Sequence, residues 1–301
     1  ALPIFFLLRS QYLNLLVLTA ERGLLSFSDA SLRVLKQAII EALDKPGPEA
    51  DKRSLIELLT QIEPRSISEV LAPMLSELSP GLQQQSLETM LVYPDPIFTG
   101  YVDALIFPSQ EPSILALAMR YVWLTQTDAD VSQLKPYLRP SIAPVVRGTA
   151  ASMMLKRGRP GERAQATYIL QQMLIHPEER ERVMGCRALG EADYMQGLRL
   201  HVPNLLQDDS LRVRRSMLDA IAATRLEEHY PSLLEALRYK STREAAMQAL
   251  VALGDYAPPM FMPVLSHPST PDSTRLQVLQ EIRMNRILHP STLLASNQTD
   301  T

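Results

Sequence analysis

The sequence predicts an all-α protein built as a solenoid, that is, a superhelix of antiparallel helix pairs. One pattern of residues occurs twice between Leu200 and Gly254. Apolar residues recur there with the spacing of a helix, and no stretch of the sequence alternates with period two for long enough to predict a strand. Self-similarity at a near-constant spacing is typical of stacked repeats, so it outweighs any single residue as an indication of the fold.

The repeated pattern has two halves. His201–Leu206 (HVPNLL) returns 28 residues later as His229–Leu234 (HYPSLL), and Arg214 returns 29 residues later as Arg243. A proline is tolerated in the first turn of a helix, because its missing N–H would have no helical partner there. Each copy therefore predicts a first helix that starts at the proline and a second helix that starts near the arginine.

Each predicted helix carries one apolar face. In the second helix of the first copy, apolar residues recur at i, i+4, i+7 and i+8, namely at Val213, Met217, Ala220 and Ile221. Two short amphipathic helices cannot bury their apolar faces alone, so we expect neighbouring pairs to stack. The sequence predicts an inter-helix core that includes Leu206, Leu234, Ile221 and Leu250.

The pattern resembles the HEAT repeat in its short, PBS-lyase-type form. The shared features are the proline of the first helix, the Leu-Leu pair, an Asp in the turn and the Val-Arg that opens the second helix. The resemblance implies that Asp208 and Arg214 take the places of the turn acid and the second-helix arginine, which bond within and between repeats. The second copy departs from this pattern, because Ser241 and Thr242 replace the acid. Tetratricopeptide repeats are the rival helical array, but their Trp, Gly and Tyr positions are not seen.

Proline punctuates further helix pairs along the chain. We expect helices at Ser31–Leu43, Ser54–Ile62, Ile67–Leu78, Leu82–Val92, Ile97–Ile106, Ile114–Leu124, Val131–Leu138, Pro144–Leu155, Arg163–Leu174 and Val183–Leu189. A last, weaker unit is expected at Pro263–Leu265 and Arg275–Ile282. The expected organisation is an apolar connector over residues 1–30, a solenoid over 31–290 and a polar tail over 291–301.

Composition bounds the class of protein. Of the 301 residues, 46% are hydrophobic and 21% are charged, so a sizeable core is expected and disorder is not. The net charge of −3 gives no global indication of nucleic-acid binding. The single cysteine, Cys186, excludes an internal disulfide framework and fits a reducing compartment, so we expect a cytoplasmic protein.

The N-terminal residues leave two interpretations open. The sequence begins with Ala1 rather than Met, which raises the expectation of a piece of a longer protein. Ala1–Leu8 is strongly apolar, but it is far shorter than the roughly 20 residues that span a bilayer. It is either part of a capping helix that packs on the first repeat or the end of a transmembrane helix. The second interpretation would place the protein at the membrane face.

No constellation typical of catalysis is present. The sequence lacks HExxH, CxxC, G-x-S-x-G and a phosphate-binding loop. The histidines are scattered along the array, and His176, His267 and His289 precede prolines in turns, so neither a metal site nor a cofactor is expected. Cys186 lies on a predicted buried face, where an inert core thiol is expected. We therefore expect no catalytic residues and a protein that is not an enzyme.

The middle of the chain is basic. Residues 147–243 contain 16 Lys and Arg against 12 Asp and Glu, whereas residues 1–146 contain 11 against 16. Arginines near second-helix starts would line up along one edge of a solenoid, either as a structural ladder with turn acids or as a surface for an acidic protein segment or lipid headgroups. We predict that an anionic partner binds the row Arg182, Arg212, Arg215 and Arg243, with Arg214 reserved for the ladder. Few aromatic residues interleave, so nucleic acid is not expected.

Two further resemblances widen the choice of function. The apolar helix end, the connector Tyr12–Leu16 (YLNLL) and the HEAT-like units are similar to the soluble region that follows the membrane domain in bacterial nucleotide-carrier-like transporters. HEAT-like bilin lyases, which also lack classical catalytic motifs and cradle a tetrapyrrole, are the enzyme alternative. We expect a non-enzymatic protein–protein interaction scaffold, either free or as the soluble region of a larger membrane protein.

Overall fold

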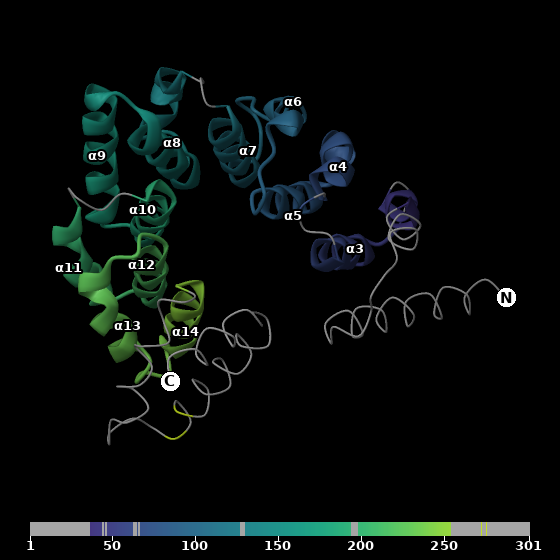
Figure 1. Cartoon of the computed structure of the whole chain (residues 1–301). Helices are drawn as coiled ribbons and strands as arrows, with labels where there is room; N and C mark the ends of the chain where they lie inside the picture. The colour runs from purple at the N-terminus through teal and green to yellow at the C-terminus, as the bar shows by residue number, and fades with distance from the viewer. Residues whose placement is uncertain are drawn as a thin grey trace, which may run out of the picture. The chain divides into compact units, whose positions relative to one another are not determined.

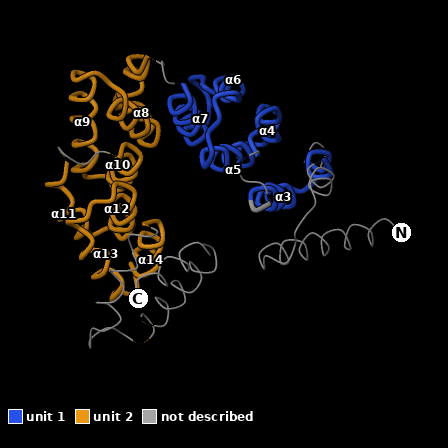
Figure 2. The backbone as a smooth tube through the Cα atoms, in the orientation of Figure 1, with its two compact units in different colours: residues 1–129 blue, residues 130–301 orange. Residues whose placement is uncertain are grey.

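The chain is all-helical wherever its structure is described. A computed structural model describes residues 37–43, 45, 47–62, 65, 67–126, 130–193, 198–253, 272 and 275. Every regular element within these residues is an α-helix or a 3₁₀ helix, and none of them is in a strand. The predicted all-α class is therefore confirmed for this part of the chain. The chain divides into two compact units, Ala1–Ala129 and Asp130–Thr301 (Figure 2).

The first unit alternates between longer and shorter helices (Figure 1). After the helical residues 37–43 come α3 (Glu49–Ile62), α4 (Ile67–Leu71) with η1 (Ala72–Glu77), α5 (Pro80–Met90), η2 (Pro96–Phe98) with α6 (Thr99–Asp103), and α7 (Pro112–Thr125). The longer helices pack in sequence, α3 on α5 and α5 on α7, while η1 contacts α6. Longer and shorter helices thus form two neighbouring rows.

Tyr121 ties the two rows of the first unit together. Its ring on α7 is fully buried, and its hydroxyl donates to the main-chain oxygen of Asp95 at 2.9 Å and accepts from the N–H of Asp95 at 3.1 Å. Asp95 in turn accepts from the N–H of Ile97 and so caps η2. Burial raises the pKa of Tyr121, which keeps the hydroxyl protonated as a donor.

The second unit contains four successive helix pairs in its described part. They are η3 (Val131–Leu138) with α8 (Pro144–Arg157), α9 (Pro160–Leu174) with α10 (Glu179–Ala192), η4 (Arg199–His201) and α11 (Val202–Leu206) with α12 (Leu211–Ala223), and η5 (Glu227–His229) and α13 (Tyr230–Ala236) with α14 (Arg243–Ala252). The two members of each pair contact each other. The second helices pack in the order α8, α10, α12 and α14 (Figure 1).

The two copies that the sequence repeats have the same local structure. In each, a 3₁₀ turn ends at a histidine and leads into a short helix with proline in its first turn, Pro203 in α11 and Pro231 in α13. Ser210 then caps α12 by accepting from the N–H groups of Arg212 and Val213. The predicted helix starts are therefore confirmed in both copies.

The ends of the second helices also repeat. Asp193 directly follows α10 with a φ of 51°, and Arg225, 32 residues later, follows α12 with a φ of 49°. A left-handed residue after the last turn lets the chain fold back and satisfy helix carbonyls, as the bond from Leu226 N–H to Ile221 O does here. Residues other than glycine are strained in the left-handed conformation. Because this conformation nevertheless recurs at Asp193 and Arg225, the packing of the helices imposes the turn geometry.

The predicted core is half correct. Ile221 and Leu250 are fully buried, as expected. The prediction was wrong for Leu206 and Leu234, which are only half-buried. The buried members of the two Leu-Leu pairs are instead Leu205 and Leu233. Neighbouring residues on a helix point about 100° apart, so a short helix can turn only one of two adjacent leucines fully towards its partner.

Helices α8 and α10 approach closely through glycine. A methyl group added at Gly148 would lie 3.2 Å from the main-chain oxygen of Met184 and 3.3 Å from Cβ of Ala188. Gly185 on α10 is equally restricted on its other side, with Leu174 Cδ2 at 3.0 Å. Glycines therefore set the spacing of α10 from α8 and from α9.

Several predictions lie outside the described residues. These are the connector over residues 1–30, the helix stop at Gly254, the polar tail over 291–301 and the weaker last unit except for residues 272 and 275. Whether one solenoid continues across residues 127–129 stays a prediction, because each unit is described by itself.

Candidate functional site

An arginine near the start of three successive second helices binds the turn that precedes its own helix. The guanidinium donates to a main-chain oxygen six residues earlier in each case: Arg182 to His176 at 2.9 Å, Arg214 to Asp208 at 2.8 Å and Arg243 to Leu237 at 3.0 Å. These bonds fix the angle between each turn and its second helix. We call them, with the inter-pair bonds described next, the arginine ladder.

Arg182 also reaches the next helix pair. Its Nε lies 2.7 Å from Oδ2 of Asp208 and its Nη2 lies 2.9 Å from Oδ1, which makes a forked ion pair across the junction between α10 and α12. Asp208 Oδ1 accepts in addition from the N–H of Ser210 at 2.8 Å. Only 17% of the Arg182 side chain and 11% of the Asp208 side chain are exposed, so solvent screens the pair little.

The protonation equilibria of this pair favour its charged form. Burial alone would raise the pKa of Asp208, but the hydrogen bonds from Arg182 and from the N–H of Ser210 outweigh burial and hold the pKa below its ordinary value. The hydrogen bond to Asp208 raises the pKa of Arg182, against the effect of burial. The ion pair is therefore intact at neutral pH.

A second buried ion pair joins α8 to α10. Arg147 donates through Nη1 to the main-chain oxygens of Pro140 at 3.0 Å and Ile142 at 2.9 Å, and through Nη2 to Oε1 of Glu181. Each side chain of the pair is only 8% exposed. Arg147 thus repeats both tasks of Arg182, binding its own turn and the next helix pair.

The junction between α12 and α14 differs from the other two. Arg182 reaches an acid 26 residues on, whereas Arg215 donates through Nε at 3.1 Å and Nη2 at 2.7 Å to the main-chain oxygen of Ser241, also 26 residues on. The two tasks of Arg182 are therefore divided here between Arg214 and Arg215. Among the described residues, Arg214 forms no ion pair with a carboxylate.

The four arginines of the predicted partner row fall into two groups. Arg182 and Arg243 belong to the arginine ladder in the same way as Arg214, the residue that the sequence analysis reserved for it. Arg212 is 82% exposed, with its Nη1 3.5 Å from Oε1 of Glu179, and Arg215 is exposed although it binds Ser241. Whether a partner binds this row stays a prediction.

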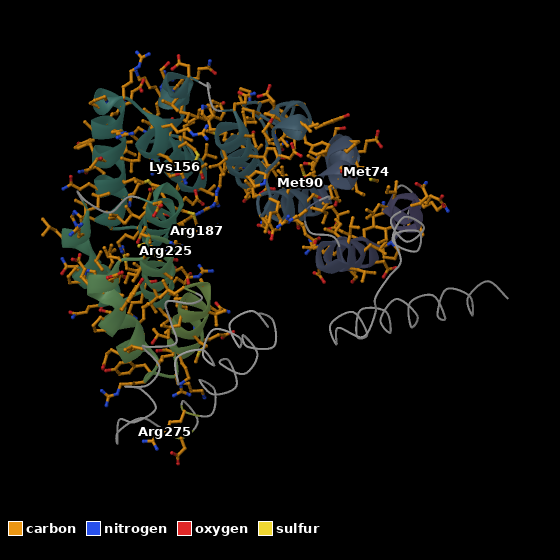
Figure 3. The ribbon with its side chains drawn as sticks, in the orientation of Figure 1. Met74, Met90, Lys156, Arg187, Arg225 and Arg275 are labelled. Carbon is orange, nitrogen blue, oxygen red and sulfur yellow. The ribbon has the colours of Figure 1, made fainter. Side chains whose placement is uncertain are left out.

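Two further arginines are exposed beside Arg212 and Arg215. Arg180 and Arg187 are exposed on α10, which packs against α12, and their separation of seven residues places them on one face of the helix (Figure 3 labels Arg187). We call Arg180, Arg187, Arg212 and Arg215 the second-helix arginine surface. The seven-residue spacing was visible in the sequence, but Arg187 was not selected because it is far from the helix start.

Two acids moderate the charge of this surface. Glu179 lies beside Arg212, and Asp219 on α12 interacts with Arg187. Burial raises the pKa of Asp219, and the positive charge of Arg187 opposes that increase. Glu191, which follows Arg187 by four residues on α10, adds a third acid on the same side of that helix, and the four arginines still outnumber these three acids.

A groove of about 830 Å³ lies between α11 and α13, with α12 as its floor. Its apolar lining consists of Pro203, Leu206, Leu218, Pro231 and Ala236. Arg214, Ser241 and Thr242 line it as well, so it borders the junction that lacks an acid. We call this feature the α11–α13 groove. The sequence pattern does not predict this groove, because it places Leu206 in the buried core.

Cys186 and His176, which could in principle take part in chemistry, occupy structural positions. Cys186 is fully buried, which confirms its predicted core position, and burial raises its pKa to about 12, which disfavours a reactive thiolate. His176 lies in a turn, as predicted, and its Nδ1 accepts from the N–H of Glu178 at 3.1 Å. Within the described ranges, no three His, Cys, Asp or Glu residues cluster closely enough to hold a metal ion. No helix in this part of the chain has both the length and the apolar character needed to cross a bilayer.

The chain matches no protein-family model and no curated protein. The arginine ladder, the second-helix arginine surface and the α11–α13 groove are therefore the observations from which a function has to be argued.

Proposed function

We propose that the chain is a HEAT-like α-solenoid that acts as a non-enzymatic scaffold and binds an acidic segment of a protein partner on the second-helix arginine surface. The observation that carries the proposal is the exposure of four arginines on the adjacent helices α10 and α12. Stacked second helices present an extended surface of this kind to partners.

Three recurring features support the HEAT-like part of the proposal. Arginines bind main-chain oxygens six residues earlier at three successive second helices. A 3₁₀ turn followed by proline opens α11 and α13 alike. Left-handed residues close α10 and α12 at a separation of 32 residues. Helix pairs that are merely all-α, without being repeats of one unit, would not be expected to share all three features.

The charges favour an acidic partner. Arg180 and Arg212 lie in the first turns of α10 and α12, where the helix dipole adds partial positive charge. Guanidinium groups bind carboxylates through paired hydrogen bonds, which suits Asp- or Glu-rich segments. The single thiol of the chain fits the cytoplasm, where we place this interaction.

A labelled decaglutamate peptide tests the proposal. The double variant Arg180→Glu/Arg212→Glu should bind the peptide at least about tenfold more weakly by fluorescence anisotropy and lose most of the salt dependence. The melting temperature should hardly change, because Arg212 makes only an exposed ion pair.

The matched control is Arg139→Glu/Lys240→Glu, which changes the charge equally at exposed sites of the same unit. It should retain at least half of the affinity. Equal losses in the two double variants would show attraction to net charge alone and would contradict the proposal, as would unchanged binding by Arg180→Glu/Arg212→Glu.

The bilin-lyase alternative and the association with a membrane remain predictions from the sequence. No observation on the described residues favours a bilin lyase. Association with a membrane through the N-terminal segment concerns residues 1–36, which lie outside the described part of the chain.

A further inference from the structure

The α11–α13 groove is suited to a small ligand. Its volume of about 830 Å³ falls within the range of roughly 300–1,000 Å³ that is usual for small-molecule sites. Such sites combine a mainly apolar lining with a few polar groups that orient the ligand. Here the apolar lining comes from both short helices and from Leu218 of α12, and Arg214 supplies a cation.

The cation in the groove results from the missing acid of the arginine ladder. At the preceding junction, both carboxylate oxygens of Asp208 bind Arg182, which leaves Arg214 only the main-chain oxygen of Asp208. At the next junction, Asp208 has two counterparts: Leu237, whose main-chain oxygen binds the arginine six residues later, and Ser241, which is bound by the arginine 26 residues earlier. Neither of them offers a carboxylate. Arg214 therefore reaches the groove without an ion pair to any carboxylate of the described residues, and its charge helps only at longer range to lower the pKa of Asp208.

The one acid that lines the groove is already engaged. Glu235 binds Arg238 through Oε2 at 3.3 Å and accepts from the hydroxyl of Tyr239 through Oε1 at 3.0 Å. It does not form an ion pair with Arg214. A ligand carboxylate near Arg214 and Ser241 would thus meet a cation rather than a neutralised pair.

The dimensions favour a small molecule over a partner helix. The walls are α11, of five residues, and α13, of seven residues. A seven-residue helix is only about 10 Å long, so the groove cannot hold several turns of another helix.

We propose that the α11–α13 groove binds a small amphiphilic carboxylate. Its carboxylate takes the place of the missing turn acid beside Arg214, and its apolar body lies on Leu206, Leu218 and Ala236. The groove borders the second-helix arginine surface at Ser241, which Arg215 binds, but the ligand proposal does not depend on the scaffold proposal.

Titration calorimetry with decanoate tests the site, and 1-decanol is the neutral probe of equal chain length. Decanoate should bind once per chain and at least about tenfold more tightly than 1-decanol, since a charge-assisted hydrogen bond contributes at least that much. Absence of decanoate binding, or equal affinities for the two probes, would overturn the proposal.

A substitution that restores the acid tests the mechanism. Ser241→Asp should pair with Arg214 and lower the decanoate affinity by about tenfold or more, while Ser241→Asn, which has the same shape without the charge, should lower it less than about threefold. Equal effects of the two variants would overturn the proposal.

A second pair of variants separates the groove from the ladder. Arg214→Gln and Arg243→Gln each remove one equivalent bond to a main-chain oxygen, but only Arg214 lines the groove. Decanoate binding should fall by about tenfold in the first variant and remain in the second. If Arg214→Gln fails to fold by circular dichroism, the Ser241 variants decide the question.

Discussion

At the junction between α10 and α12, Arg182 binds its own turn and the carboxylate of Asp208, whereas at the junction between α12 and α14 these tasks fall to Arg214 and Arg215. The second junction ends on the main-chain oxygen of Ser241, and neither Arg214 nor Arg215 forms an ion pair across it among the described residues. The comparison teaches that a main-chain acceptor can replace the acid structurally. It also shows a consequence of this replacement: the Arg214 guanidinium lies at the α11–α13 groove without an ion pair among the described residues.

The ion pair between α8 and α10 should give the largest effect of any ladder substitution. Glu181→Ala leaves Arg147 buried without its carboxylate, and breaking a buried pair in this way costs about 3–5 kcal/mol. Chemical denaturation measures the change in the free energy of unfolding. Glu179→Ala, whose side chain is 44% exposed and 3.5 Å from Arg212, is the control and should cost less than about 1 kcal/mol. Similar losses in both variants would show that burial of the pair does not matter.

At the junction between α12 and α14, we expect buried apolar side chains to supply most of the stability. Leu233→Ala removes a fully buried side chain from α13 and should lower the free energy of unfolding by about 2–4 kcal/mol. Leu234→Ala removes its half-buried neighbour and should cost less than about 1 kcal/mol. Thermal melts of the two variants provide the comparison, and the reverse order would contradict the corrected core.

Asp208→Asn should have a smaller effect than Glu181→Ala, because the Arg182–Asp208 pair is more exposed than the Arg147–Glu181 pair and the amide keeps a hydrogen-bonding group in place. We expect a loss of about 2 kcal/mol at neutral pH, as for hydrogen bonds between charged groups. Asp209→Asn changes a neighbouring exposed acid and should be nearly neutral. Equal effects of the two substitutions would remove Asp208 from the arginine ladder.

The same substitution predicts a pH dependence. Because the pKa of Asp208 is lowered in the folded protein, its stabilisation is fully present above the unfolded pKa, about 3.9, and is lost as the pH falls through the folded pKa. The difference in unfolding free energy between wild type and Asp208→Asn should therefore be constant near neutrality and shrink below about pH 4. A difference that persists undiminished in acid would show that the charge of Asp208 is not what stabilises the junction.

The sequence was sufficient for most of the helix pairs because their signals are local, although the helix expected at Ile67–Leu78 divides into α4 and η1 and the one expected at Val131–Leu138 is a 3₁₀ helix. Proline at helix starts, as at Pro203 and Pro231, and apolar spacing depend on residues within one or two turns. The same pattern placed Ile221 and Leu250 in the core correctly. These features need no knowledge of how one pair packs on the next.

The candidate site depends on packing between pairs and was predicted only in part. The resemblance placed Asp208 in the ladder, but which guanidinium meets its carboxylate depends on shifts of a few ångströms between α10 and α12. Arg182 was therefore assigned to a partner surface although it holds Asp208. The groove was missed for a related reason, since the short length of α11 leaves Leu206 half-buried at the groove instead of in the core.

The smallest predicted change in stability has the opposite sign. Ser241→Asp makes the second junction resemble the first and should raise the free energy of unfolding by about 0.5–1 kcal/mol, through Arg214 and the N-terminus of α14. Ser241→Asn is the control and should leave the melting temperature unchanged within about a degree. Destabilisation by the Asp variant alone would mean that Arg214 cannot reach a carboxylate at position 241.

Double-mutant cycles test the difference between the two junctions most directly. The cycle of Arg182→Gln and Asp208→Asn, followed by urea denaturation at neutral pH, should give a coupling energy of about 1.5–3 kcal/mol. The cycle of Arg214→Gln and Ser241→Asn should give less than about 0.5 kcal/mol, because no ion pair exists there to break. Equal coupling at both junctions, or none at the first, would contradict the account.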